Sequence, residues 1–259
     1  MLSLPNGGSF TTNGLILDND STINYKGNVD ITILAGTELN TGTMTETDAN
    51  AKIALSGSGK FKARCVKTHK FTINGPEVFI INNSTTDFYA LRIGEGNSDS
   101  GLYLNSGKLV CQINPGLEGV SSGIMTASSI LEISDGAELF ASGQAYGILF
   151  TKAPPSLVGN FTGSIDFLTY ENRAAASNSV DVVYQEDVAY LFAVGGDLSI
   201  PAKSIMGVSA VPAPTPDPVV TEAAQTSDNT ISLVVICVLT FLASTVVLIR
   251  KKYNSLNRI

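Results

Sequence analysis

The sequence contains no tryptophan and a single histidine, and only 15% of its 259 residues are charged. Helix bundles need abundant Glu, Lys, Ala and Leu, so this composition favours β-structure with many turns. The histidine, His69, has no nucleophile or metal-ligating residue beside it in the sequence, and we expect it at the surface. Neither a Gly-x-Ser-x-Gly elbow nor a phosphate-binding loop is present. We therefore expect no enzyme activity, no catalytic residue, no metal ion and no cofactor.

Cysteine is also scarce. The three cysteines are Cys65, Cys111 and Cys237, and they form neither a disulfide framework nor the Cys-x-x-Cys spacing of a zinc site. Cys237 lies in a long apolar run, so only Cys65 and Cys111 could pair with each other. We expect both to be small, buried hydrophobic side chains.

Basic residues are few outside the C-terminus. The formal net charge is −7, and the last ten residues carry four positive charges and no acid. Subtracting those four charges leaves −11 for residues 1–249, which argues against a nucleic-acid partner. The basic stretch Lys60–Lys70 is interpreted as a solvated strand face. Acidic residues alternate over Asp18–Asp20, as calcium ligands do, but an Asx-turn explains them equally well.

One long apolar run stands out near the C-terminus. Residues 231–249 carry no charge, and as a helix they would extend about 28 Å, close to the hydrocarbon thickness of a bilayer. We predict a single transmembrane helix. Its anchoring side chains would be Ile231, Leu233, Val234, Val235, Ile236, Leu239, Phe241, Leu242, Val246, Val247, Leu248 and Ile249.

The flanks of this helix predict its orientation. Arg250, Lys251 and Lys252 follow it directly, and the positive-inside rule places them in the cytoplasm as a stop-transfer signal, with residues 250–259 as a basic tail. The remainder of the chain would then be extracellular. The opening residues show no export signal. Two explanations remain: either the true start is missing, which we favour, or the chain is tail-anchored with its body in the cytosol.

Residues 209–230 form a Pro-rich segment before the helix. Four prolines alternate from Pro212 to Pro218, which fixes φ and removes backbone donors. We predict a disordered, extended stalk that holds a folded body away from the membrane.

The order of these segments resembles a known family. A spacer, a Thr-containing pentapeptide, an apolar helix and an Arg-Lys-Lys tail resemble the sorting region of Gram-positive surface proteins processed by sortase. That family has Leu-Pro-x-Thr-Gly where residues 223–227 are Ala-Ala-Gln-Thr-Ser, so only Thr226 matches at a defined position. The resemblance implies a bacterial protein at the cell membrane or cell wall. Because the Leu, Pro and Gly of the cleaved peptide are absent, we expect the helix to be retained.

The body, residues 1–208, contains similar windows of two alternating apolar stretches around a Gly-centred turn. Alternation at spacing two predicts strands with one buried face. Leu102 and Leu104 align with Leu131 and Ile133 at an offset of 29, and other windows are spaced nearer 20. Such periods indicate a solenoid. The windows are Ile31–Gly42, Ile53–Arg64, Phe71–Asn82, Leu102–Ile113 and Leu131–Ser142.

We therefore predict an all-β fold, a right-handed parallel β-helix (solenoid). Residues 121–150 resemble the Gly-punctuated repeats of large bacterial surface β-helix proteins, some of which bind carbohydrate. The alternative is an antiparallel β-sandwich, because alternation does not reveal strand direction. In a β-helix, Cys65 and Cys111 would lie about two coils, or ~9.6 Å, apart, too far for a disulfide. We expect both thiols to be free.

Three functions fit this organisation. The first is adhesion or glycan binding along a flat solenoid face, with a glycan or a host or cell-wall surface as partner. Tyr89, Tyr103 and Tyr146 are the first aromatic residues to consider for stacking on sugars. The second is a structural spacer that displays a missing N-terminal domain. The third is a polysaccharide lyase or hydrolase, although the paired carboxylates that such an enzyme needs are not recognisable.

Overall fold

The computed structural model describes residues 2–210, except for residues 5, 19, 85–86, 95–98, 115–120, 153 and 187. These residues belong to the first of two units into which the chain divides, Met1–Val211. The second unit, Pro212–Ile259, lies outside the described residues. The predicted stalk beyond residue 210, the transmembrane segment, Thr226 and the basic tail fall in this undescribed part.

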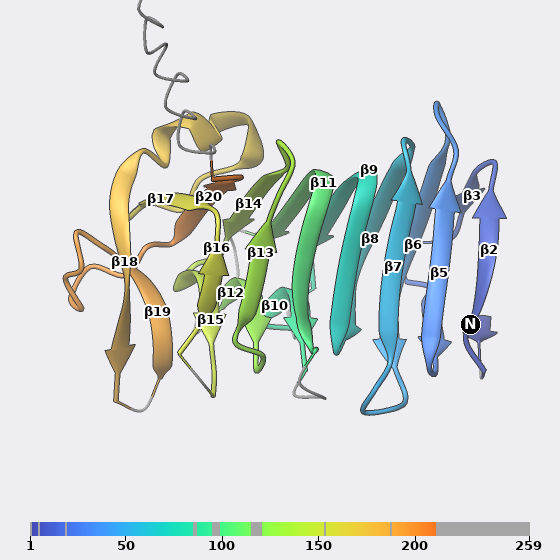
Figure 1. Ribbon diagram of the computed structural model, residues 1–259, viewed down its shortest axis with the longest axis horizontal. Helices are drawn as coiled ribbons and strands as arrows, with labels where there is room; N and C mark the ends of the chain where they lie inside the picture. Colours follow the sequence, from blue (N-terminus) through green and yellow to red (C-terminus); the bar gives the residue numbers. More distant parts are fainter. Residues whose placement is uncertain are drawn as a thin grey trace, which may run out of the picture. The chain divides into compact units, whose positions relative to one another are not determined.

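The described residues form twenty strands, joined in one sheet, and one 3₁₀ helix (Figure 1). This confirms the predicted all-β class. In chain order the elements are β1 (Leu2–Leu4), β2 (Gly8–Thr12), β3 (Leu15–Ile16), β4 (Thr22–Tyr25), β5 (Asn28–Ile33), β6 (Glu38–Glu46), β7 (Lys52–Gly57), β8 (Lys60–Thr68), β9 (Lys70–Asn82), β10 (Tyr89–Ile93), β11 (Gly101–Ile113), β12 (Ser122–Thr126), β13 (Ile130–Ile133), β14 (Glu138–Ser142), β15 (Tyr146–Phe150), β16 (Ser156–Val158), β17 (Asn160–Ser164), η1 (Tyr170–Ala175), β18 (Asn178–Gln185), β19 (Ala189–Val194) and β20 (Ser204–Val208).

The first sixteen strands form three rows in which each strand pairs in parallel with the next. Row A is β2, β5, β7, the first half of β9, the first half of β11, β13 and β16. Row B is β3, the first halves of β6 and β8, the second halves of β9 and β11, and β14. Row C is β1, β4, the second halves of β6 and β8, β10, β12 and β15. The antiparallel alternative is wrong for these strands, because every pairing among them that the structure describes is parallel.

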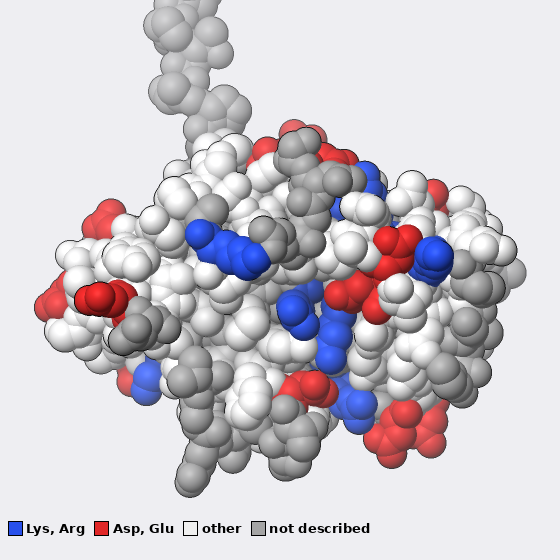
Figure 2. All heavy atoms as spheres, turned by 90° about the horizontal axis from the view of Figure 1, so that it is seen from below, with Lys and Arg blue, Asp and Glu red and all other residues white. Residues whose placement is uncertain are grey.

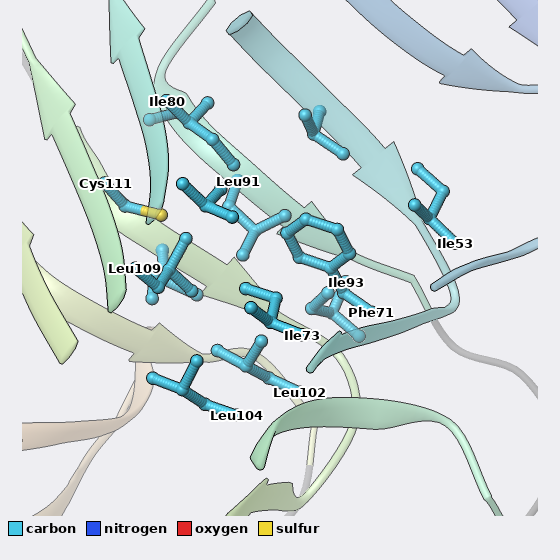
Figure 3. Packing of buried hydrophobic residues seen from close by; sticks show 14 of the residues in the cluster. Ile53, Phe71, Ile73, Ile80, Leu91, Ile93, Leu102, Leu104, Leu109 and Cys111 are labelled. Carbon is cyan, nitrogen blue, oxygen red and sulfur yellow. The ribbon is translucent and has the colours of Figure 1, made fainter. Parts of the chain in front are cut away.

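Apolar side chains from the three rows meet in one core. Along row A, Ile53 pairs with Phe71 and Phe71 pairs with Leu102, and each side chain is at most 2% exposed. Figure 3 shows these residues pointing toward Leu91 of row C and Leu109 of row B. Alternation thus places an apolar side chain of each strand beside one of the neighbouring strand. Together these side chains form a column, in which each strand buries the apolar face of the strand before it.

The repeat seen in the sequence is confirmed by the register of the strands. Leu102 pairs with Leu131 at the expected offset of 29. In row B, Leu109 pairs with Leu139, an offset of 30. The extra residue lies in the turn between β13 and β14. β11 has no turn at the matching position, because it continues from row A into row B as one strand.

Three glycines stack at the corner between rows A and B. Gly57, Gly75 and Gly107 have φ of 95°, 111° and 90°. A Cβ on Gly75 would lie 2.3 Å from the carbonyl oxygen of Gly57, and one on Gly107 would lie 2.7 Å from that of Gly75. Positive φ and close approach of the neighbouring backbone both require glycine here.

The last strands change direction. β16 still pairs with β13 in parallel, but β20 pairs antiparallel with both β14 and β17. β18 and β19 form an antiparallel hairpin, and β19 also pairs antiparallel with β15. The region after Phe150 therefore contains one further parallel strand, β16, and an antiparallel cover formed by β17 to β20.

Cys65 and Cys111 are buried and free, as predicted, but for a different reason. Cys111 pairs with Ile80 and belongs to row B, whereas Cys65 pairs with Thr43 in row C. The two residues thus lie in different rows, whereas the separation of ~9.6 Å expected from the sequence placed them in one column. Burial raises the pKa of the Cys65 thiol to about 12 and raises that of Cys111 well above its ordinary value, so both remain protonated at neutral pH.

Candidate functional site

A groove lies on the outer face of row B. Its volume is about 540 Å³. Its lining residues come from the segment before β4, from β6, β8, β9 and β11, and from η1. The groove therefore crosses successive strands of row B. The lining residues are Asp20, Asn40, Lys62, Ala63, Arg64, Phe79, Ile81, Asn83, Val110, Gln112, Tyr170 and Glu171.

Strand register explains why these side chains gather. In row B the residues Ala63, Ile80 and Cys111 are buried in the core, so the residues on either side of each face outward. Asn40, Lys62, Phe79 and Val110 are direct neighbours across four strands. Arg64, Ile81 and Gln112 occupy the outward positions two residues further along. The floor of the groove is therefore formed by side chains on paired strands, which hold them rigidly.

Aromatic rings form one end of the groove. The rings of Phe79 and Tyr170 are nearly perpendicular, at 87°, with centroids 6.0 Å apart. Tyr170 also packs edge-on against Phe140 at 5.9 Å, which explains why the outward-facing Phe140 is fully buried. The η1 segment thus covers the last strands of row B and closes the groove there.

Polar contacts hold η1 in place. The backbone N–H of Tyr170 donates to Gln112 Oε1 at 3.2 Å. The Arg173 guanidinium lies 4.0 Å from the Tyr170 ring centroid and donates from Nε to Glu138 Oε1 at 2.6 Å. Lys108 approaches the same ring at 5.3 Å. Because cations stack on Tyr170, Phe79 is the aromatic residue better placed to receive a ligand.

Charged side chains form the other end. Arg64 Nη1 donates to Asp20 Oδ1 at 3.2 Å, and Nη2 donates to Thr43 Oγ1 at 3.0 Å. Arg64 Nε is buried and has no hydrogen-bond partner. Lys62 Nζ lies 2.8 Å from Glu38 Oε2. The groove thus combines an apolar half and a cationic half.

Two carboxylates line the groove, and one of them is poorly suited to be a general acid. Glu171 accepts hydrogen bonds from its own backbone N–H and from the Thr169 hydroxyl, and these lower the pKa of its carboxyl below the ordinary value. The acid of a glycoside hydrolase needs a raised pKa so that it can carry a proton at neutral pH. The environment of Glu171 favours the ionised form instead.

The three tyrosines proposed from the sequence lie outside this groove. Tyr103 lies on row A, whereas Tyr89 and Tyr146 lie on row C, where each pairs with Ser122. Tyr89, on row C, has Lys67 at 5.5 Å and Arg92 at 6.0 Å from its ring centroid. Tyr103, on row A, donates its hydroxyl proton to the backbone oxygen of Asp99 at 3.1 Å. Tyr146 is only 9% exposed. The structure therefore does not bring the three together.

Phe79 and Tyr170 are not among the residues that we proposed from the sequence. Phe79 could have been found, because it lies between the buried Val78 and Ile80 and is therefore an aromatic residue at an outward position. Tyr170 gave no local signal, since η1 reaches row B only through the final fold.

A second polar cluster lies where β6 and β8 end, in row C. Glu46 Oε2 and His69 Nδ1 are buried without hydrogen-bond partners. Burial raises the pKa of the Glu46 carboxyl, which its own backbone N–H and nearby charges only partly oppose. His69, expected at the surface, is in fact half-buried.

Positive charge is also concentrated near the start of β7. In the view from below, Figure 2 shows a band of Lys and Arg atoms with acidic atoms nearby. Lys52 and Lys70 both contact Asp99 Oδ2, at 2.7 and 3.5 Å. The single Asp99 carboxylate offsets one of these two lysine charges within the fold.

Two further sequence expectations concern metals and membranes. Asp18 Oδ1 accepts the Asp20 backbone N–H at 3.3 Å, which is the Asx-turn that we considered beside calcium binding. Within the part of the chain that the structure describes, no cluster of three or more His, Cys, Asp or Glu side chains could hold a metal ion. The same residues include no helix of sufficient length and hydropathy to cross a bilayer, and residues 231–249 lie outside them.

Comparison of the chain with known protein families, curated proteins and solved structures finds no match.

Proposed function

We propose that the body is a right-handed parallel β-helix that binds glycans on its outer face. The three parallel rows support the fold, because the chain visits rows A, B and C in the same order in successive turns. A crossover between parallel strands is right-handed in nearly all proteins, which supports the hand.

The groove on row B is the observation that carries the glycan proposal. Sugar-binding sites combine an aromatic ring, against which the C–H face of a sugar packs, with fixed polar groups for its hydroxyls. Phe79 supplies the ring, and the side-chain amides of Asn40, Asn83 and Gln112 supply donors and acceptors beside it. All except Asn83 lie on paired strands, so little ordering entropy is lost on binding.

Replacing Phe79 by alanine should weaken glycan binding about tenfold, the equivalent of roughly 1.4 kcal/mol of lost contact. Ligands would first be identified with the full chain on a glycan array, and affinity would then be measured by calorimetry. Tyr89→Ala, a surface aromatic residue on row C, is the matched control and should retain affinity. Loss in the Tyr89 variant with retention in the Phe79 variant would place the site elsewhere.

We further propose that the chain is a single-pass surface protein of a bacterial cell, anchored by residues 231–249 with Arg250, Lys251 and Lys252 in the cytoplasm. The uncharged length of this segment and its basic flank support the proposal. The full chain should stay with membranes through a carbonate wash, and protease added to intact cells should degrade residues 1–208. Release by carbonate would contradict the anchor, and protection from protease would contradict the orientation.

The spacer function is the alternative if no glycan binds. In that case the stacked strands would act only to carry another domain away from the membrane.

A further inference from the structure

Arg64 is held in the groove by contacts of unequal strength. Its side chain is 28% exposed, whereas that of its ion-pair partner Asp20 is 90% exposed. Thr43 fixes one end of the guanidinium from the neighbouring strand. An ion pair with one partner so exposed contributes little, because solvent screens it and the acidic side chain loses entropy in forming it. Asp20 can therefore leave Arg64 at small cost.

The guanidinium has unused capacity for a carboxylate. Arginine presents N–H donors in a planar fork that matches two carboxylate oxygens at once. In Arg64, the Asp20 carboxylate contacts only Nη1, through one oxygen. The neighbouring Nη2 carries two N–H groups, of which Thr43 accepts one, so Nη1 and Nη2 can together receive a carboxylate. Asp20 thus occupies the position that an incoming carboxylate would take, but satisfies it incompletely.

The apolar and cationic halves lie at a suitable separation for one ligand. Lys62 pairs directly with Phe79, and Arg64 is two residues further along β8. Strand geometry places the Cα atoms of Arg64 and Phe79 about 8 Å apart. A sugar ring packed on Phe79 can therefore direct an exocyclic carboxylate toward Arg64, with Lys62 adding positive charge beside it.

We propose that the groove binds an acidic glycan, with Arg64 receiving a sugar carboxylate that displaces Asp20. This inference rests on the glycan binding proposed above and specifies the class of sugar. Asp20 is then an internal competitor for the ligand. A glycan is favoured over an acidic peptide because the aromatic ring and the amides of Asn40 and Gln112 match a ring that carries several hydroxyls.

The test compares two oligosaccharides that differ only at C6. The full chain is titrated by calorimetry with a tetramer of β-1,4-linked glucuronic acid and with cellotetraose. The acidic tetramer should bind at least about tenfold more tightly at low salt, and this preference should shrink as salt rises. Arg64→Gln should abolish the preference, so that the two tetramers bind the variant with equal affinity.

Asp20→Asn provides the second variant. Because Asp20 is highly exposed, this change should not disturb folding, and circular dichroism would verify that for both variants. Removing the competing charge should strengthen binding of the acidic tetramer by about 1.5- to 5-fold, the range expected for an exposed ion pair. The ratio of the two affinities, acidic tetramer over cellotetraose, should therefore rise by the same factor.

The outcomes separate the two proposals. Equal affinity for the two tetramers, or no gain in Asp20→Asn, overturns this inference and leaves glycan binding intact. Failure of both tetramers and of every glycan on the array overturns both proposals. Binding of tetraglutamate as tightly as the acidic tetramer would overturn the assignment to a glycan.

Discussion

Replacing Gly75 by alanine is expected to lower the free energy of unfolding by more than about 3 kcal/mol. Two costs combine. Its φ of 111° is strained for any residue with a Cβ, and the added Cβ would lie 2.3 Å from the Gly57 carbonyl oxygen. That oxygen belongs to the backbone of the adjacent strand, so it cannot move without disturbing the rows. Urea unfolding followed by far-ultraviolet circular dichroism measures the loss.

Gly36→Ala is the matched control for Gly75→Ala. Gly36 also has a positive φ, 72°, but its added Cβ would meet nothing within 4 Å. It should therefore cost only the conformational strain, about 1–2 kcal/mol. If the two variants lose equal stability, contact between successive turns is not what requires glycine at position 75.

Replacing Phe71 by alanine is the second change with a large expected effect. Phe71 is fully buried between Ile53 and Leu102 in row A, and Figure 3 shows its ring among side chains of the other rows. Truncation removes the ring from the core and leaves a cavity that rigid strands cannot close. Such changes cost about 3–5 kcal/mol, measurable by urea unfolding of the full chain.

Thr72→Ala, at the adjacent outward position, is the control for Phe71→Ala. Its side chain faces away from the core and is partly exposed, so the change should stay within about 0.5 kcal/mol. A small loss in Phe71→Ala, similar to that of the threonine variant, would show that the column is not tightly packed.

The sequence alone determined which residues face inward along each strand. Period-two alternation is a local property, because successive side chains of any strand point to opposite faces. It therefore identified columns such as Leu102 above Leu131 without knowledge of the partner strand. The Gly-centred turns have an equally local cause: Gly136, between β13 and β14, has a φ of 74°, which a residue without Cβ adopts freely.

Tertiary structure alone decided what gathers on the outer faces. Strand direction depends on which segments meet, so the antiparallel cover of β17 to β20 has no signature in alternation. Tyr89, Tyr103 and Tyr146 looked alike in sequence, yet the path of the chain placed Tyr103 on row A and the other two on row C, with Tyr146 buried. The groove needed Arg64 from β8, Phe79 from β9 and η1, more than a hundred residues after Arg64. Only the packing of distant strands brings these side chains together, because contacts between them are set by the stacking of rows and not by local conformation.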